Sequence, residues 1–268
     1  MTQFYLGTHR PRWLERTDIP LFVSRTVMEK SPGVLRDSLP RARGRWAMDS
    51  GGFTQLHKHG RWMITPDQYV AEVRRARDEI GGLDWAAPMD WMCEPSARAM
   101  TGLSVREHQA LTVDNFLHLR DLAPDLPIVP VLQGFEIRDY QVCVDLYERA
   151  GVDLANETVV GLGSVCRRQA TEEIDLIASM LHARGLKLHG FGVKRDGLAA
   201  YAPCLASADS LAWSYGGRKV RPCTHGPNRH GRTAVNEANC IHYAMAWRRK
   251  VLATIAAPVQ LALPVGAM

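Results

Sequence analysis

Aspartates stand at the ends of several short apolar runs in this sequence. Asp49 is followed by Ser-Gly-Gly and then by Phe53, so a carboxylate, two glycines and an aromatic ring lie in succession. Glycines let the backbone approach a flat ligand, and a phenyl ring offers that ligand a stacking face. Asp90 and Asp209 end two further apolar runs. Carboxylates that share a site can divide nucleophilic and acid–base roles, although each aspartate singly also fits a helix cap or a turn.

The apolar runs are eight in number and alternate with helical segments. Several are nearly continuous in apolar residues, as strands buried on both faces should be. Eight strand–helix units of this length predict an α/β fold, specifically a (β/α)8 TIM barrel, with a doubly wound open sheet as the alternative. The expected strands cover residues 4–7, 21–24, 46–49, 84–90, 128–133, 158–163, 188–193 and 208–213.

Capping signals delimit the helices between these runs. Thr65 precedes a proline, and Ser104 stands three residues before Glu107 in a capping box. Gly151 and Gly185 each stop a helix. The expected helices cover residues 68–80, about 104–122, 137–150, 171–184, 196–205 and about 239–254, whereas 28–43 is expected to be loop-like.

A barrel would gather the polar residues at the strand ends, because TIM-barrel active sites lie at the carboxyl ends of the strands. We expect one domain over residues 1–268. The strand ends carry Asp49, Asp90, Gln133, Gly161, Gly163, Lys194 and Asp209.

Composition narrows the class of protein further. The 268 residues are 46% hydrophobic and 23% charged, a balance that excludes a mostly disordered chain. No apolar run is long enough to span a bilayer, and the N-terminus has no signal pattern. Six cysteines in such a chain indicate thiols or metal ligands, and a cytoplasmic location is expected. The net charge is +5 with arginine dominant, which suits phosphate contacts without demanding them.

The strand ends, taken in order, resemble the tRNA-guanine transglycosylase family. The similarity runs from about residue 45 to 250 and is most specific at residues 49–53, Asp-Ser-Gly-Gly-Phe. Weaker matches follow in register: Pro-Met-Asp at 88–90, Val-Leu-Gln-Gly at 131–134, Val-Gly-Leu-Gly at 160–163, Gly-Phe-Gly-Val at 190–193 and Ala-Asp-Ser at 208–210. That family is a TIM barrel that exchanges a guanine in a polynucleotide for a 7-deazaguanine.

The resemblance implies a role for each matching residue. Asp209 becomes the nucleophile on the sugar C1′, and Asp49 becomes the general acid and base. The base would be held by its Watson–Crick edge and its two faces. Asp90 and Gln133 would bind that edge with backbone groups at Gly161 and Gly163, while Phe53 would stack on one face and Phe191 would lie near the other.

The same family carries a structural zinc after its eighth strand, held by three cysteines and a histidine. This chain departs from that pattern within residues 219–245, which hold two Cys-x-His pairs around a glycine-rich loop. Thiolate and imidazole ligands in that place still suit tetrahedral Zn2+. We expect Cys223, His225 and Cys240 as ligands with His230 as the fourth, while His242 and Glu237 are alternatives; buried thiols with unrelated histidines would be the non-metal interpretation.

Within this superfamily the compact, arginine-rich chain most resembles the DpdA group, which places a 7-deazaguanine such as preQ0 into DNA. The expected partners are therefore DNA and the free base, with Arg195, Arg218 and Arg221 on the phosphates and a homodimer through the zinc region as a possibility. The alternatives are a tRNA transglycosylase and a TIM-barrel glycoside or nucleoside hydrolase. A non-enzymatic nucleic-acid-binding subunit is disfavoured because Asp49 and Asp209 are both present.

Overall fold

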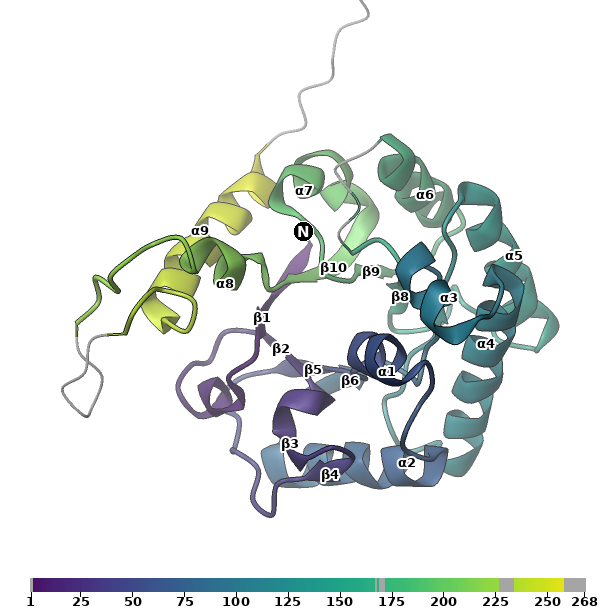
Figure 1. Cartoon of the computed structure of the whole chain (residues 1–268). Helices are drawn as coiled ribbons and strands as arrows, with labels where there is room; N and C mark the ends of the chain where they lie inside the picture. The colour runs from purple at the N-terminus through teal and green to yellow at the C-terminus, as the bar shows by residue number, and fades with distance from the viewer. Residues whose placement is uncertain (1, 167, 169–171, 227–233, 258–268) are drawn as a thin grey trace, which may run out of the picture.

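A curled sheet of parallel strands with helices around it forms the body of the molecule (Figure 1). The computed structural model describes residues 2–166, 168, 172–226 and 234–257. All eight expected strands are present and pair in parallel. They are β1 (Gln3–Thr8), β2 (Leu21–Ser24), β5 (Trp46–Asp49), β6 (Leu83–Ala86), β7 (Val131–Leu132), β8 (Val160–Leu162), β9 (Leu188–Gly190) and β10 (Leu205–Ser210).

The strand order shows how the sheet curls. It runs β6-β5-β2-β1-β10-β9-β8-β7, so the first and last strands of the chain lie side by side, with Tyr5 opposite Asp209. At the two edges, a parallel bridge joins Ala86 of β6 to Ile128, and Val129 N–H donates to the Ala86 carbonyl at 3.1 Å. The result is an eight-stranded, all-parallel, TIM-like sheet. The pairing of β1 with β10 excludes the doubly wound alternative, in which the first and last strands would not meet.

Helices cover the outside of this sheet. Both predicted N-terminal caps are confirmed as capping boxes, at Thr65 with Gln68 and at Ser104 with Glu107. The first of these helices ends in a π turn over Ala76–Ile80. The helices are α1 (Gly52–His59), α2 (Pro66–Arg75), α3 (Pro95–Thr101), α4 (Val105–Leu122), α5 (Ile137–Arg149), α6 (Glu172–Ala183), α7 (Arg195–Tyr201), α8 (Ala212–Gly217) and α9 (Ile241–Ala256).

Two expectations are corrected at the end of the chain's last strand–helix unit. The helix expected to reach residue 205 ends at Tyr201, because Pro203 lies in a 3-10 turn over Ala202–Cys204. Leu205 can therefore begin β10 three residues earlier than expected. Trp213, expected in that strand, instead lies in α8, where its Nε1 donates to the Gly7 carbonyl at 2.8 Å. The stretch expected to be loop-like contains a small hairpin, β3 (Glu29–Ser31) and β4 (Val34–Leu35).

Alternation along the strands separates two cores. The side chains of Phe4 and Leu6 join the large cluster between sheet and helices, whereas Tyr5 between them joins a small cluster inside the curl. Phe22 and Trp85 occupy the same inner layer on their own strands. Successive side chains of a strand point to opposite faces of a sheet, so every second residue of each strand faces the interior. This period determines which strand-end residues can meet.

Candidate active site and metal centre

The predicted site residues occupy the next inward-facing positions toward the carboxyl ends of the strands. Asp49 lies two residues after the interior Ala47, and Asp209 lies two residues after Ser207. Gln133 and Gly163 follow β7 and β8 at equivalent places. Because the strands are parallel, these positions converge at one end of the sheet.

Asp209 is held at one of its two carboxylate oxygens. The side chain is buried, with 5% of its surface exposed. Its Oδ1 accepts a hydrogen bond from the Gly192 N–H at 2.8 Å and lies 3.4 Å from His189 Nε2. Within the described residues, no hydrogen bond reaches Asp209 Oδ2. The second oxygen is thus left available to a ligand at the mouth of the sheet.

Asp49 lies within electrostatic reach of Asp209, from a strand separated from β10 by β2 and β1. Burial raises the pKa of Asp49, hydrogen bonds from Ser24 and the Gly51 N–H lower it in part, and the negative charge of Asp209 raises it again. Ser24 stands opposite Asp49 in the β2–β5 register. A raised pKa favours the protonated form of the carboxyl group, which is the form that a general acid needs.

Asp90 and Gln133 form a hydrogen-bonded pair next to these carboxylates. Gln133 Nε2 donates to Asp90 Oδ2 at 2.6 Å, and Ser50 Oγ donates to Asp90 Oδ1 at 3.0 Å. Burial and then the charge of Asp49 raise the pKa of Asp90 from its ordinary value of 3.8 to about 7, although the bonds from Ser50 and Gln133 oppose the rise. The orientation of the Gln133 amide is set at its other end, where Oε1 accepts from Ser164 Oγ at 2.6 Å.

The two expected glycines leave room for the side chains around them. A Cβ on Gly163 would lie 2.4 Å from Gln133 Nε2, and one on Gly161 would lie 2.5 Å from the Phe191 ring. Phe191 packs inside the curl against Trp85, with ring centroids 6.2 Å apart. The glycines therefore permit Gln133 and Phe191 to occupy the positions on which the site depends.

Phe53 is exposed, unlike the carboxylates. It belongs to the first turn of α1, is 38% exposed, and stacks on His57 with centroids 4.0 Å apart. The His57 ring is anchored by Nδ1 on the Phe53 carbonyl at 3.0 Å and by Nε2 on Ser96 Oγ at 3.1 Å. The structure thus places the stacked Phe53–His57 pair shortly after the carboxyl end of β5.

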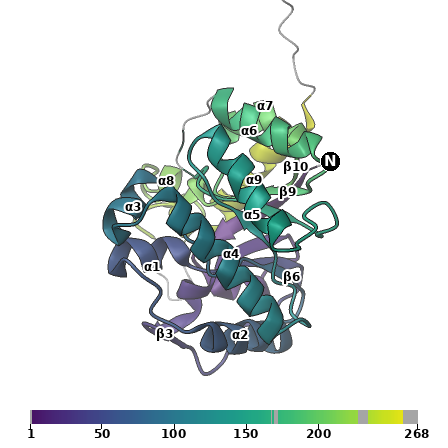
Figure 2. The ribbon, with the colours of Figure 1, turned by 90° about the vertical axis from the view of Figure 1, so that its right-hand side faces the viewer.

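The three expected arginines lie at the rim. Arg195 begins α7 and lies 3.5 Å from Asp196, so part of its charge is balanced. Arg218 and Arg221 follow α8 and are exposed. In Figure 2, α8 projects on the same side of the molecule as α1 and α3. A basic run that the sequence reading did not assign, residues 57–61 (His-Lys-His-Gly-Arg), ends α1 on that side.

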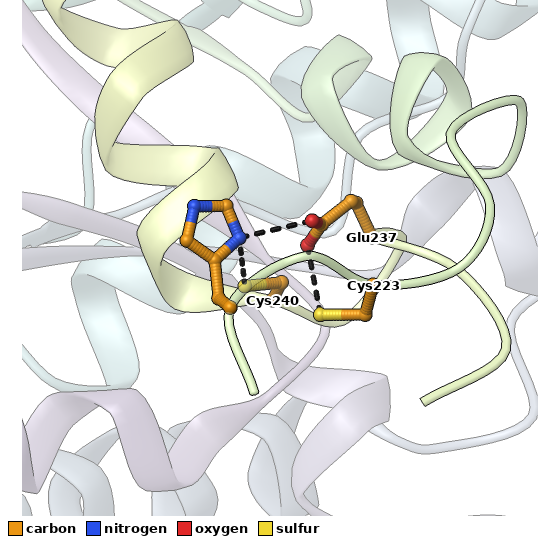
Figure 3. A group of neighbouring side chains, drawn as sticks. Cys223, Glu237 and Cys240 are labelled. Atoms are coloured by element: carbon orange, nitrogen blue, oxygen red, sulfur yellow. Dashed lines mark hydrogen bonds and ion pairs between the residues drawn. The ribbon is translucent and has the colours of Figure 1, made fainter. Parts of the chain in front are cut away.

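Four side chains with metal-ligand chemistry meet near the N-terminus of α9 (Figure 3). The ligand atoms of Cys223, His225, Glu237 and Cys240 all lie within 4.8 Å of one another. Cys223 Sγ donates to Glu237 Oε2 at 3.1 Å, and the other Glu237 oxygen lies 2.9 Å from His225 Nδ1. Cys240 Sγ is 3.4 Å from the same nitrogen. Thiolate, imidazole and carboxylate ligands suit tetrahedral zinc, so this cluster could hold a metal ion.

The cluster unites the three expected ligands with Glu237, one of the alternatives for the fourth place. Glu237 is fully buried, and Thr224 donates to it from both its N–H at 2.8 Å and its Oγ1 at 2.9 Å. His242 stacks on the His225 ring at 5.4 Å and is not among the four clustered ligands. His230 lies outside the described residues.

The family follows from a comparison with known proteins. A family model described as DpdA, DeoxyPurine in DNA protein A, matches residues 1–263. The chain belongs to the DpdA family. Membership in this paralogue group of the tRNA-guanine transglycosylases implies a DNA 7-deazaguanine modification enzyme with DNA as its substrate. No curated protein matches the sequence. Among the described residues, no helix is long and apolar enough to cross a membrane.

Two residues near the DpdA carboxylates were missed by the sequence reading. His189 appears in the sequence as a histidine within an apolar run, a context typical of a core position, yet it faces Asp209. Ser164 has a φ of 55°, in the left-handed region, and orients Gln133. No sequence pattern indicated this unusual backbone conformation, so nothing in the sequence pointed to Ser164.

A cavity of about 500 Å³ lies at the opposite end of the sheet from the DpdA carboxylates. Its charged groups pair with one another: Arg45 with Asp84, and Arg120 with Glu157 at 3.0 Å. Tyr5 OH also donates to Asp84, at 2.7 Å. Since the amino-terminal end of such a sheet serves stability and these charges are already balanced, we assign no chemistry to this cavity.

Proposed function

We propose that this chain exchanges guanine in DNA for a 7-deazaguanine base such as preQ0 through a covalent intermediate between Asp209 and deoxyribose. The observation that carries the proposal is the state of Asp209. Its Oδ1 is held by the Gly192 N–H at 2.8 Å while Oδ2 accepts no hydrogen bond from the described residues. A nucleophile needs one fixed and one available oxygen, and family membership supplies the substrate class.

The two steps divide between two carboxyl groups. In the first, Asp209 Oδ2 bonds to C1′, the C1′–N9 bond breaks, and the electron pair leaves with guanine, which takes a proton from Asp49. In the second, Asp49 removes the N9 proton of the incoming base. That nitrogen bonds to C1′, and the pair of the ester bond returns to Asp209. Burial supports the acid role, because it raises the pKa of Asp49.

Asp90 and Gln133 would read the edge of either base. Guanine and 7-deazaguanine share an N1–H and a 2-amino group, both donors that a carboxylate accepts. Gln133 would hold the Asp90 carboxylate by the 2.6 Å bond between them. Backbone groups at Gly161 and Gly163 would add further contacts. Phe53 and Phe191 would border the two faces of a base that has left its stack.

The rim residues would hold the strand around the flipped nucleotide. Arg195, Arg218 and Arg221 lie after β9 and β10, on the carboxyl side of the sheet. The run 57–61 at the end of α1 would add positive charge on the side of the molecule where α8 projects. The cluster of Cys223, His225, Glu237 and Cys240 would bind a structural Zn2+ outside the reaction. A homodimer through this region is compatible with the proposal.

Trapping of the intermediate tests the function. Protein, a guanine-containing DNA and free preQ0 are mixed, denatured and resolved by mass. We expect a covalent protein–DNA adduct with the parent chain and none with Asp209→Asn, which keeps the shape but cannot form the ester. Asp114→Asn, an exposed change in α4, is the control and should leave the adduct unchanged. An adduct that persists in Asp209→Asn would move the nucleophile to another residue.

The alternatives give different products in the same assay. Incorporation into tRNA and not DNA would indicate a tRNA transglycosylase. Release of guanine without incorporation of the second base would indicate a nucleoside hydrolase. Incorporation of labelled preQ0 into DNA alone is the result expected here.

A further inference from the structure

His189 lies fully buried in the interior of the curled sheet, and the steps proposed above give it no role. It extends from β9 into a box of aromatic rings, three from other strands and Phe191 from just after β9. The Trp85 centroid is 4.6 Å away, that of Phe191 is 4.9 Å, that of Phe22 is 5.4 Å and that of Tyr5 is 5.9 Å. Rings on this many sides fix the plane of the imidazole, so its two nitrogens have defined directions.

Both ring nitrogens face polar groups of β10. His189 Nδ1 lies 2.8 Å from Ser207 Oγ, and Nε2 lies 3.4 Å from Asp209 Oδ1. Ser207 and Asp209 are consecutive inward-facing residues of that strand, so the imidazole ring reaches from one to the next. An unprotonated Nε2 would turn its lone pair toward a carboxylate. The favourable tautomer therefore carries its proton on Nε2, and its Nδ1 accepts a hydrogen bond from the Ser207 hydroxyl group.

We propose that His189 is a positioning residue for Asp209. This proposal rests on the function proposed above. The His189 Nε2–H and the Gly192 N–H both donate to Asp209 Oδ1. The carboxylate is thereby kept from rotating, and Oδ2 is presented to C1′. After the ester forms through Oδ2, Oδ1 becomes its carbonyl oxygen and keeps both donors. They stabilise the carboxylate that reappears when the second base displaces it.

Three substitutions separate this role from a structural one. His189→Gln can place an amide N–H near the position of Nε2, His189→Asn can reach only the side of Nδ1, and His189→Phe fits the aromatic box without any polar atom. A merely structural role predicts that Phe, the closest match to the ring surroundings, behaves best. The positioning role predicts that Gln behaves best and that the losses fall on kcat rather than on KM.

The main experiment measures steady-state exchange of labelled preQ0 into DNA by the full chain. We expect His189→Gln to keep kcat within about three-fold of the parent, and His189→Asn and His189→Phe to lose on the order of ten-fold or more, with KM for DNA changed by less than about two-fold. Parent-like kcat in the Phe variant, or equal losses in Gln and Asn, would overturn the proposal.

A second measurement does not depend on activity. Nitrogen NMR of the parent protein labelled in histidine should show the His189 proton on Nε2, and Asp209→Asn should shift that nitrogen while Asp114→Asn should not. A proton on Nδ1, or no response to Asp209→Asn, would contradict the contact. If the tautomer is as expected but no exchange occurs at all, the proposed function fails and the His189–Asp209 contact stands. If a substitution at His189 unfolds the chain, Ser207→Ala replaces it in both assays, with a smaller loss of kcat expected.

Discussion

Asp90 should impose a pH-dependent cost on folding that a single substitution removes. It is buried among groups that make its ionisation unfavourable, and burial followed by the charge of Asp49 raises its pKa from 3.8 to about 7. Between these two values the folded chain holds a proton that the unfolded chain releases. The stability of the parent protein must therefore fall as the pH rises from about 4 to about 7, and the full cost persists above that range.

The magnitude follows from the shift. About three pKa units correspond to roughly 4 kcal/mol when Asp90 is fully ionised, at about 1.4 kcal/mol per unit. More than half of this cost develops between about pH 5 and about pH 8, because the folded chain loses the extra proton over that range. Asp90→Asn keeps the shape of the side chain, cannot ionise and relieves Asp49 of a like charge. The free energy of unfolding of Asp90→Asn, relative to that of the parent, should therefore rise by this part of the cost across that pH range.

Urea unfolding of the two proteins at several pH values measures the difference. Asp114→Asn, an exposed change in α4, is the control and should follow the parent at every pH. The variant should also bind preQ0 more weakly than the parent at about pH 8, because an amide offers one acceptor oxygen and a donor where the ligand needs two acceptors. A stability difference that stays flat between pH 5 and pH 8 would refute this account of the Asp90 environment.

Three further predictions concern the base pocket, the metal centre and the DNA face. Gly163→Ala places a Cβ 2.4 Å from Gln133 Nε2, so it should weaken preQ0 binding on the order of ten-fold in calorimetry. Cys223→Ser removes a ligand, so about one equivalent of Zn2+ should be lost by metal analysis and the unfolding midpoint should fall by roughly 10 °C. Exchanging Arg218 and Arg221 together for glutamine should reduce the slope of log affinity for DNA against log salt by up to about 1.8, with preQ0 binding unchanged.

Each of these has a control elsewhere in the chain. Gly216→Ala, where the nearest atom to a new Cβ is 3.3 Å away, should leave preQ0 binding unchanged. Cys204→Ser, outside the metal cluster, should keep the zinc. Glutamine at both Arg74 and Arg77, which pair with Asp125, should not alter the salt slope. Loss of zinc or of the salt slope in these controls would contradict the assignments.

Local signals were sufficient to predict the regular elements. Parallel strands that are buried on both faces are rich in apolar residues, so apolar runs in the sequence predicted all eight strands. Helix caps depend on residues close together in the chain. The N-cap predicted at Thr65 and the capping box predicted at Ser104 are both present, and Thr65 also forms a capping box with Gln68. The last strand was misplaced because Pro203 ends the preceding helix early. Residues 202–207 could continue the helix or begin the strand, and their composition alone does not show which they do.

The sequence predicted only those residues of the candidate site that belong to local motifs. Asp49, Asp90 and Asp209 were singled out because a barrel would gather its strand ends at one site, and because the order of these strand ends resembles one superfamily. The metal ligands Cys223, His225 and Cys240 were expected, while the fourth place remained open between His230, His242 and Glu237. A carboxylate 12 residues from His225 in the chain carries no spacing signal of its own, and only the folded chain brings Glu237 to 2.9 Å from His225 Nδ1.

The sequence by itself determined the strands, the caps and the carboxylates at the strand ends, because each depends on residues close together in the chain. Only the tertiary structure decided which of them meet. The parallel curl and its two-residue period turn Asp49, Gln133 and Asp209 inward at one end. The same period places His189 against Asp209, 20 residues away in the chain, where a local pattern indicates only a buried histidine. Contacts between strands depend on register, and register is set by the whole sheet.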